Sequence, residues 1–185
     1  AYARYRNSAS AAANAIPWEL VILGDGDTRE ALIQECSDLG VRNHVHPVGA
    51  KPYGELPIYY GLASAFIHAS TTEQWGLVVN EAMASGLPVL VSNRCGCADD
   101  LVQEGVNGFT FDPLNVDDMA QKLVRLAGSP AQLAAFARAS RKIIAAWSPR
   151  TFAEGLSRAI QVAVSNPSPV ATWFDQMLLW TLIHR

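Results

Sequence analysis

The sequence predicts an α/β fold, with a doubly wound, Rossmann-like parallel sheet of about five strands and helices on both faces. Short apolar segments rich in β-branched residues alternate with segments of helical spacing as far as Pro113. Beyond Pro113 the pattern is almost wholly helical. Half of the 185 residues are hydrophobic, which is enough for a sizeable core in one domain.

The strands are predicted from short apolar runs that end at glycine, proline or polar residues. Each run is too short to be a typical buried helix. Because segments with helical spacing separate them, neighbouring strands are expected to run parallel. The expected strands are 18–23, 45–48, 65–68, 88–91 and 108–111.

The helices are predicted from apolar residues at intervals of three and four. Thr28 is a candidate N-cap and Gly40 a candidate C-cap for the first full helix, and Pro57 must lie in the first turn of the next. The expected helices are the end of one within 1–15, then 28–40, 53–62, 76–85, 99–103, 117–126, 131–146 and 151–164.

The segment 166–185 is predicted to be a helical tail. It follows the flexible-looking stretch 166–169, and it packs either on this domain or on a part of the protein outside the sequence. Its apolar part, 173–183, is interrupted by Asp175 and Gln176. No stretch reaches the roughly 20 apolar residues that cross a bilayer. The start at Ala1, with neither Met nor a leader, indicates a piece of a longer protein.

The charge balance and the cysteines exclude several classes of function. With 14 basic against 17 acidic residues and no charge run, the chain has no electrostatic footprint for nucleic acid or for an anionic membrane. Cys95 and Cys97 are one residue apart, which suits neither a zinc knuckle nor a CxxC redox pair. A cytoplasmic domain that binds a small molecule is therefore expected.

The loop after the third predicted strand carries the chemistry. Parallel sheets bind ligands at the carboxyl ends of their strands, and free N–H groups at a helix start favour a phosphate. Gly76 has no Cβ, so a ligand can approach the backbone closely. Glu81 lies roughly 7 Å further along the helix, at 1.5 Å per residue. That is about the span from a diphosphate to a ribose, whose hydroxyls a carboxylate can bind.

Glu73 precedes the same helix. Its carboxylate can accept hydrogen bonds from sugar hydroxyls beyond the phosphates, or stabilise positive charge on a sugar ring as the leaving group departs. Two glutamates at this spacing are also common as solvated surface charges. The spacing of Glu73 and Glu81 alone therefore leaves both interpretations open.

The residues around the two glutamates resemble a known family. Glu73, seven intervening residues and Glu81, followed by Ala-Met-Ala-Ser-Gly-Leu-Pro-Val, are similar to the E-x7-E signature of the retaining GT-B glycosyltransferases of family 4, also called glycosyl transferases group 1. The resemblance covers roughly residues 17–165. Further matches lie at Gly24, Asp25, Gly26, Gly49, Gly96, Asp100, Val102, Gly105, Asn107 and Gly108.

The resemblance implies a role for each matching residue. Glu73 would be the catalytic residue that contacts the donor sugar, and Glu81 would hold the ribose hydroxyls. Gly49 and Lys51 would form the loop against the nucleobase. The donor sugar and diphosphate would lie against Trp75, Gly76, Leu77 and Val78. Transfer would retain the anomeric configuration without cofactor or metal, because helix N-termini and basic side chains neutralise the phosphates.

The resemblance also implies a larger protein. Residues 1–165 would be the C-terminal, donor-binding domain without its first strand, its Arg and Lys diphosphate clamp, or the N-terminal acceptor-binding domain. The parent enzyme would move a sugar from a UDP, GDP or ADP sugar to a saccharide or lipid-linked acceptor, in the cytoplasm or at the membrane periphery. This chain alone would bind a nucleotide weakly and transfer nothing.

Several positions depart from the family pattern. Trp75 replaces a usual Phe, and Asp100 replaces a glutamate. Cys97 replaces a glycine and is either a reactive thiol or, as we favour, a small buried residue. Lys51 and Arg94 are candidates to neutralise the diphosphate or are merely structural.

Other classes of function are less well supported. His44 and His46 share a strand face and would suit a metal pair only with further ligands, while His68 is expected to be a polar residue at a strand end. Neither a phosphate-binding P-loop nor a nucleophile elbow occurs, which argues against nucleotide hydrolases and esterases. A non-catalytic nucleotide-binding module and a nucleotide-sugar epimerase of the same fold stay open. The intact Glu73 and Glu81 argue against the first, and the motif context argues against the second.

Overall fold

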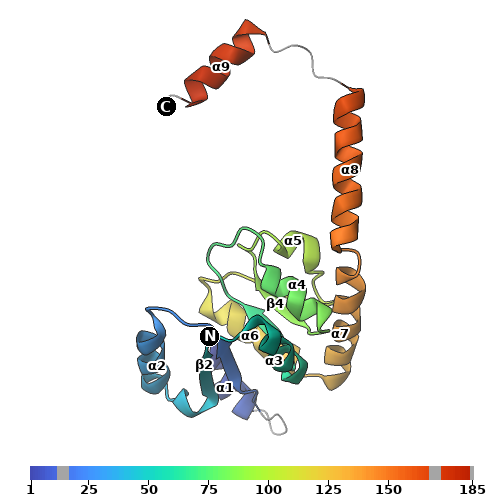
Figure 1. The fold of residues 1–185 in the computed structure, drawn as a ribbon. Helices are drawn as coiled ribbons and strands as arrows, with labels where there is room; N and C mark the ends of the chain where they lie inside the picture. The colour runs from blue at the N-terminus through green and yellow to red at the C-terminus, as the bar shows by residue number, and fades with distance from the viewer. Residues whose placement is uncertain (12–16, 167–171, 184–185) are drawn as a thin grey trace. The chain divides into compact units, whose positions relative to one another are not determined.

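The computed structural model describes residues 1–11, 17–166 and 172–183. It forms two compact units, residues 1–145 and 146–185 (Figure 1). The first unit contains the five strands found in the described residues, and the described part of the second unit contains two helices. The boundary of a donor-binding domain at residue 165 stays a prediction.

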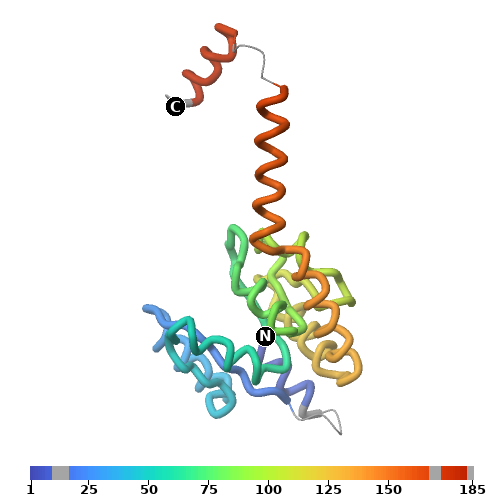
Figure 2. Tube along the Cα trace, turned by 45° about the vertical axis from the view of Figure 1, so that its right-hand side comes forward, coloured from blue at the N-terminus to red at the C-terminus, as the bar shows by residue number. Residues whose placement is uncertain are grey.

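The five strands form two parallel sheets. β1 (Leu20–Leu23) pairs with β2 (Val45–Gly49), and β4 (Val89–Ser92) lies between β3 (Phe66–His68) and β5 (Gly108–Phe111). The number of strands and their parallel direction agree with the sequence-based prediction. A single continuous sheet does not form, because β1 and β3 are not hydrogen-bonded to each other. Figure 2 shows the segment from β1 through β2, in blue and cyan, beside the rest of the first unit.

The helices of the first unit lie before, between and after these strands, and their bounds differ from the predicted ones by a few residues. Pro57 lies in the first turn of its helix, as predicted, after a short 3-10 turn. The α-helices (α) and 3-10 helices (η) of the described residues in this unit are, in chain order, α1 (Tyr2–Ala11), α2 (Arg29–Asp38), η1 (Arg42–His44), η2 (Tyr53–Glu55), α3 (Leu56–Leu62), α4 (Leu77–Ala84), α5 (Ala98–Leu101), α6 (Val116–Ala127) and α7 (Pro130–Ile144).

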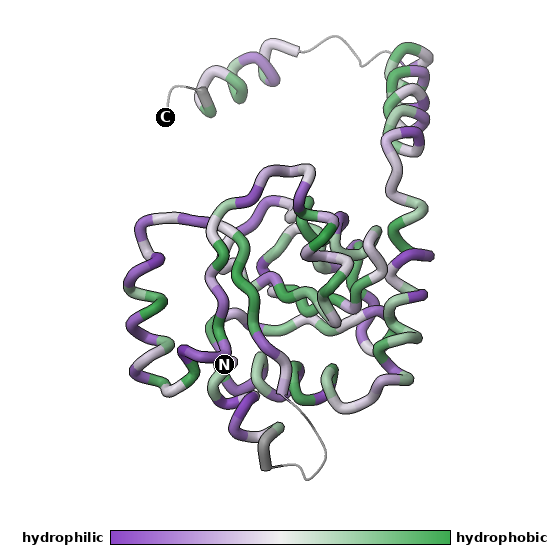
Figure 3. The backbone as a smooth tube through the Cα atoms, turned by 60° about the horizontal axis from the view of Figure 1, so that its bottom comes forward, coloured by the Kyte–Doolittle hydropathy of each residue, from purple (hydrophilic) through white to green (hydrophobic). Residues whose placement is uncertain are grey.

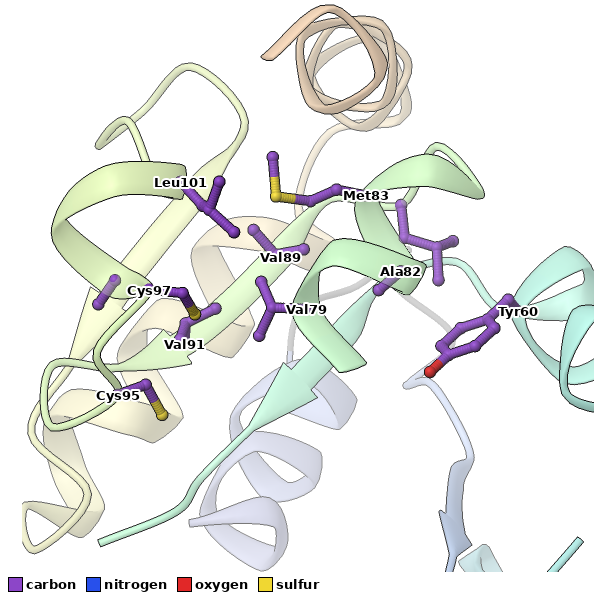
Figure 4. Packing of buried hydrophobic residues seen from close by; sticks show 11 residues of the cluster. Tyr60, Val79, Ala82, Met83, Val89, Val91, Cys95, Cys97 and Leu101 are labelled. Carbon is purple, nitrogen blue, oxygen red and sulfur yellow. The ribbon is translucent and has the colours of Figure 1, made fainter. Parts of the chain in front are cut away.

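The main core covers both faces of the three-stranded sheet. Successive side chains of a strand point to opposite faces, so Val89 and Val91 pack with α4 and α5, while Leu90 packs on the other side. Figure 4 shows the first of these clusters, with Val79, Met83 and their neighbours around β4. All four residues of β4 are buried, which confirms a strand covered on both faces. The second cluster consists of Leu90, Phe109, Phe111, Leu126 and Phe136.

Helix α1 connects the two sheets. The Tyr2 hydroxyl donates to the carbonyls of Trp18 (2.8 Å) and His44 (3.0 Å), just before β1 and β2. The Tyr5 hydroxyl accepts from the Trp18 backbone N–H (2.9 Å), and Tyr5 is fully buried. Helix α1 also packs against α6, which packs on the three-stranded sheet through its contacts with β5. The two sheets are therefore joined by a helix rather than by strand pairing.

The second unit contains α8 (Pro149–Ser165) and α9 (Trp173–Ile183), and α9 spans the apolar part of the tail. Polar and apolar residues alternate along α8 (Figure 3). Its exposed apolar side chains Phe152, Leu156, Ile160 and Val164 follow at intervals of four. Within the described residues, no helix has the length and apolar character needed to traverse a bilayer. Most of the stretch 166–169 and His184 lie outside the described residues.

Asn107 provides a test of the core. It is fully buried; its Oδ1 accepts from the Gln103 N–H (2.7 Å), and its Nδ2 donates to the Leu101 carbonyl (3.0 Å). We predict that Asn107→Ala lowers the free energy of unfolding by about 2–4 kcal/mol, because both backbone groups lose a buried partner. Thermal unfolding measures this as a loss of roughly 5–15 °C. Asn93→Ala, at an exposed position, is the control, and equal melting temperatures would contradict the prediction.

Candidate functional site

The loop that carries the predicted site, residues 70–76, is held by backbone hydrogen bonds to the loop after β4. The N–H of Gly96 donates to the Glu73 carbonyl (3.0 Å), and the N–H of Cys97 donates to the Trp75 carbonyl (3.1 Å). Glu73 and Cys95 form an isolated parallel bridge. The two loops thus continue the alignment of β3 and β4 past the carboxyl edge of the sheet, where ligands of such sheets bind.

Two glycines permit this contact between the loops. A Cβ on Gly96 would lie 1.8 Å from the Gln74 carbonyl oxygen, which no side chain tolerates. Gly76 has a φ of +98°, a left-handed conformation that favours glycine, and its own Cβ would contact Cys97 Sγ at 3.4 Å. Gly76 then forms the N-cap of α4, so this helix begins at the sheet edge.

The first turn of α4 presents backbone N–H groups. The N–H of Val79 donates to the Gly76 carbonyl (2.9 Å), which leaves those of Leu77 and Val78 as first-turn donors without an intrahelical acceptor. Leu77 and Val78 are 69% and 37% exposed. Together with the partial positive charge at a helix start, this turn can bind an anion.

Glu81 is held by a tyrosine that the sequence did not reveal. The hydroxyl of Tyr60, at the end of α3, donates to Glu81 Oε2 (2.9 Å). Tyr60 is only 9% exposed and lies beside α4 (Figure 4). Burial, and then the hydrogen bond to Glu81, raise the pKa of Tyr60 well above its usual value. The hydroxyl therefore stays protonated, and it orients one carboxylate oxygen of Glu81.

Glu73 is held more loosely than Glu81. Its Oε1 accepts from the Trp75 N–H at 3.4 Å, and its Oε2 lies 3.8 Å from His68 Nε2. The Glu73 side chain is 36% exposed. His68 is the last residue of β3, as predicted, but its proximity to Glu73 was not predicted.

A row of rings connects the two glutamates. Tyr60 and Phe66 have ring centroids 6.0 Å apart, and Phe66 stacks with His68 at 6.3 Å with an interplanar angle of 15°. Phe66 and His68 are two positions apart on β3, so they point to the same face of the sheet. Glu81 contacts one end of this row, and Glu73 lies at the other. The predicted ribose-binding and catalytic residues thus belong to one continuous group of side chains.

The predicted nucleobase loop lies at the end of β2. Gly49 has a φ of +75°, and its carbonyl accepts from the Gly24 N–H (3.1 Å), so this loop contacts the loop after β1. Lys51 Nζ lies 5.9 Å from the centre of the Tyr59 ring on α3. Tyr59 is adjacent to Tyr60 in the chain, which places Lys51 towards the α3 side of the site.

The basic side chains near these loops have different surroundings. Arg29, at the start of α2, donates a hydrogen bond to the Pro47 carbonyl (3.1 Å), and its Nη1 lies 3.8 Å from Asp25 Oδ1. The Asp25 carboxylate therefore partly neutralises the charge of Arg29. Arg94 is exposed and directly precedes the segment that pairs with the site loop. Arg94 and Lys51 therefore remain the candidates to neutralise a phosphate.

Cys97 and the pair of His44 and His46 were the other candidates for chemistry in the sequence, and contacts within the protein account for both. Cys97 is completely buried, in agreement with the favoured alternative, and burial raises the pKa of its thiol to about 11. His44 Nδ1 and His46 Nε2 lie 3.0 and 2.9 Å from the two oxygens of Glu19, a partner that the sequence did not reveal. In the part of the chain that the structure describes, no three His, Cys, Asp or Glu side chains are arranged to hold a metal ion.

The chain is similar to known proteins in sequence and in fold. The family model for glycosyl transferases group 1 matches residues 6–143. A curated relative is the GDP-mannose-dependent alpha-(1-6)-phosphatidylinositol monomannoside mannosyltransferase of Mycolicibacterium smegmatis. It is 35% identical over 129 residues, which are 66% of this chain and 34% of that protein. The chain thus spans about a third of the length of this relative.

Solved structures confirm the predicted fold class. The crystal structure of Anabaena HepE in complex with UDP has a TM-score of 0.70 and 25% identity, over 85% of this chain and 44% of that one. The crystal structure of TarM has a TM-score of 0.71 and 20% identity, over 84% of this chain and 31% of that one. The α/β arrangement of parallel strands and covering helices is that of the GT-B glycosyltransferases.

Gly96→Ala is predicted to displace the site loop. The new Cβ collides with the Gln74 carbonyl, so the hydrogen bonds to Glu73 and Trp75 must break or shift. We expect a loss of about 1–3 kcal/mol in stability and faster hydrogen exchange at the amides of residues 96 and 97. Gly54→Ala, where a Cβ meets open space, is the matched control. Unchanged protection of both amides in Gly96→Ala would contradict the expected displacement.

The thiol of Cys97 is predicted to be unreactive in the folded chain. With a pKa of about 11, only about one molecule in a thousand carries the thiolate at pH 8, and the side chain is buried. Maleimide labelling followed by mass spectrometry should modify Cys97 at least about a hundredfold more slowly in the native chain than in guanidinium. Labelling at similar rates in both conditions would restore the reactive-thiol alternative.

Proposed function

Because the chain belongs to the glycosyl transferases group 1 family, we propose that it is the donor-binding domain of a retaining glycosyltransferase of family 4. The parent enzyme transfers a sugar from a nucleotide-diphosphate sugar to a saccharide or lipid-linked acceptor. The observation that carries the proposal is the start of α4. There, two backbone donors lie between Glu73, just outside the helix, and Glu81, which Tyr60 orients inside it.

In the proposed complex, the diphosphate binds the first turn of α4. The N–H groups of Leu77 and Val78 point to its oxygens, and Gly76 allows close approach. Trp75 forms a wall next to the sugar. The free oxygen of Glu81 accepts hydrogen bonds from the ribose, and the loop of Gly49 and Lys51 lies against the base.

The chemistry proposed for this site is substitution with retention. The C–O bond between the anomeric carbon and the diphosphate breaks, and the α4 N-terminus stabilises the charge on the leaving group. Glu73 orients the sugar and stabilises the positive charge that develops on its ring. The acceptor hydroxyl attacks from the face that the diphosphate leaves, and its proton passes to the departing phosphate oxygen. Arg94 and Lys51 supply positive charge in place of a metal ion, without any further cofactor.

The donor and acceptor are proposed as classes. HepE was crystallised with UDP, and the mannosyltransferase relative is named for GDP-mannose. UDP and GDP sugars are therefore the first donors to compare, together with the ADP sugars that the family resemblance also implies. The same relative is named for a phosphatidylinositol monomannoside acceptor, which is in keeping with a lipid-linked acceptor. A cytoplasmic enzyme at the membrane periphery would meet both substrates.

The unpaired strand edges support a larger protein. β1 and β3 each pair on one side only, and a parallel strand between them would join the two sheets. We infer that the parent protein supplies this first strand of the domain, with its basic diphosphate clamp, and an N-terminal acceptor-binding domain. The isolated chain therefore binds nucleotides weakly and transfers no sugar.

Calorimetric titration with UDP, GDP and ADP tests the proposal. The best of the three should bind Glu81→Ala about 10- to 100-fold more weakly, since charge-assisted hydrogen bonds to the ribose are lost. Glu35→Ala, which removes an exposed carboxylate on α2, is the matched control. Equal binding by Glu81→Ala and the wild type would mean that Glu81 does not hold the ribose, and sugar transfer by the chain alone would refute its role as an inactive domain.

A further inference from the structure

We propose that His68 is the positioning residue for Glu73. When the donor sugar binds, Nε2–H of His68 donates a hydrogen bond to Glu73 Oε2 and fixes the carboxylate against the sugar hydroxyls. The inference rests on the proposed function, since it gives Glu73 a sugar to hold. It adds a residue to the site that lies outside the E-x7-E motif.

The first observation is an unsatisfied atom. Among the described residues that are not exposed, Nε2 of His68 is the one buried side-chain nitrogen or oxygen without a hydrogen-bond partner. Buried polar atoms nearly always have a partner, so an exception requires a physical reason. This one lies at the carboxyl end of β3, immediately before the site loop. Its location next to the predicted catalytic residue provides that reason.

The second observation is the geometry of Glu73. Its Oε2 lies 3.8 Å from His68 Nε2, slightly beyond hydrogen-bond distance, and its Oε1 contacts the Trp75 N–H at 3.4 Å. Neither contact is short, whereas Glu81 is bound at 2.9 Å by Tyr60. Catalytic hydrogen bonds in ligand-free sites are often long and shorten when the substrate binds. A small rotation of the Glu73 side chain suffices to close the gap.

The third observation is that the imidazole is the fixed partner. His68 stacks on Phe66, which in turn contacts the buried ring of Tyr60. The side chain of His68 is 21% exposed and that of Glu73 is 36% exposed. The carboxylate is therefore the group that moves. Both the Nε2–H tautomer and the imidazolium can donate this bond.

Titration calorimetry on this chain tests the assignment. The ligands are UDP-glucose, GDP-mannose and ADP-glucose, each compared with its nucleoside diphosphate, and the best pair is carried forward. In His68→Leu we expect the affinity for the nucleotide sugar to fall about tenfold, while the affinity for the diphosphate stays within about twofold. The diphosphate is thus an internal control for folding.

Two conservative variants separate positioning from packing. The amide nitrogen of glutamine can take the place of Nε2, whereas that of asparagine corresponds to Nδ1. We expect His68→Gln to keep most of the sugar-dependent affinity and His68→Asn to lose it. If both variants behave alike, or if the diphosphate affinity falls as much as that of the nucleotide sugar, His68 has a packing role and the proposal is wrong.

A double-mutant cycle shows whether His68 acts through Glu73. In a Glu73→Ala background, His68→Leu should cause no further loss of sugar-dependent affinity. Additive losses would mean that His68 contacts the donor directly, which overturns the proposal. If Glu73→Ala weakens binding of the sugar and His68→Leu does not, only the role of His68 fails. If neither variant has an effect, the proposed role of Glu73 fails as well.

Discussion

Two backbone hydrogen bonds from Gly96 and Cys97 hold the site loop from Glu73 to Trp75, directly before the start of α4. They extend the parallel register of β3 and β4 beyond the sheet, and they exist because residue 96 has no Cβ to meet the Gln74 carbonyl. The chain must then turn at Gly76, and α4 begins at the sheet edge with its first N–H groups exposed. The position of Glu73 just outside this helix, and of Glu81 inside it, follows from that turn.

Glu81 is positioned more rigidly than Glu73, and this difference suits the roles proposed for the two residues. Tyr60 binds Glu81 from within the core, and Val79 and Met83 bury the opposite side of the same helix. A contact with the ribose is the same before and during the reaction. Rigid positioning of Glu81 therefore does not slow the proposed reaction. In the proposed complex, Glu73 faces a sugar whose ring changes shape and charge, and interactions that strengthen only then are the ones that accelerate the reaction. Its longer contacts leave it free to adjust.

Local patterns in the sequence identified the elements because they depend on neighbouring residues. The strand over 108–111 was placed correctly to the residue, and α4 was one residue shorter at each end than predicted. The site that the motif predicts in the loop 70–76 stays a prediction. Contacts between residues far apart in the chain could not be predicted from local patterns. Tyr60 and Glu81 are 21 positions apart, and Glu19, just before β1, is 25 and 27 positions from His44 and His46. The division into two sheets was missed for the same reason, since strand pairing is non-local.

That division has a consequence for nucleotide binding. The base is proposed to lie at the end of β2 and the diphosphate at the start of α4, which belong to different sheets. Strand hydrogen bonds do not set the distance between them. In this chain α1 does so, since Tyr2 and Tyr5 bind the residues that precede β1, and the helix packs on α6. A helix with side-chain contacts is a more compliant connection than a continuous ladder. A strand between β1 and β3 would make the spacing rigid, so the weak nucleotide binding proposed for this chain has a cause in its strand pairing as well as in its missing charges.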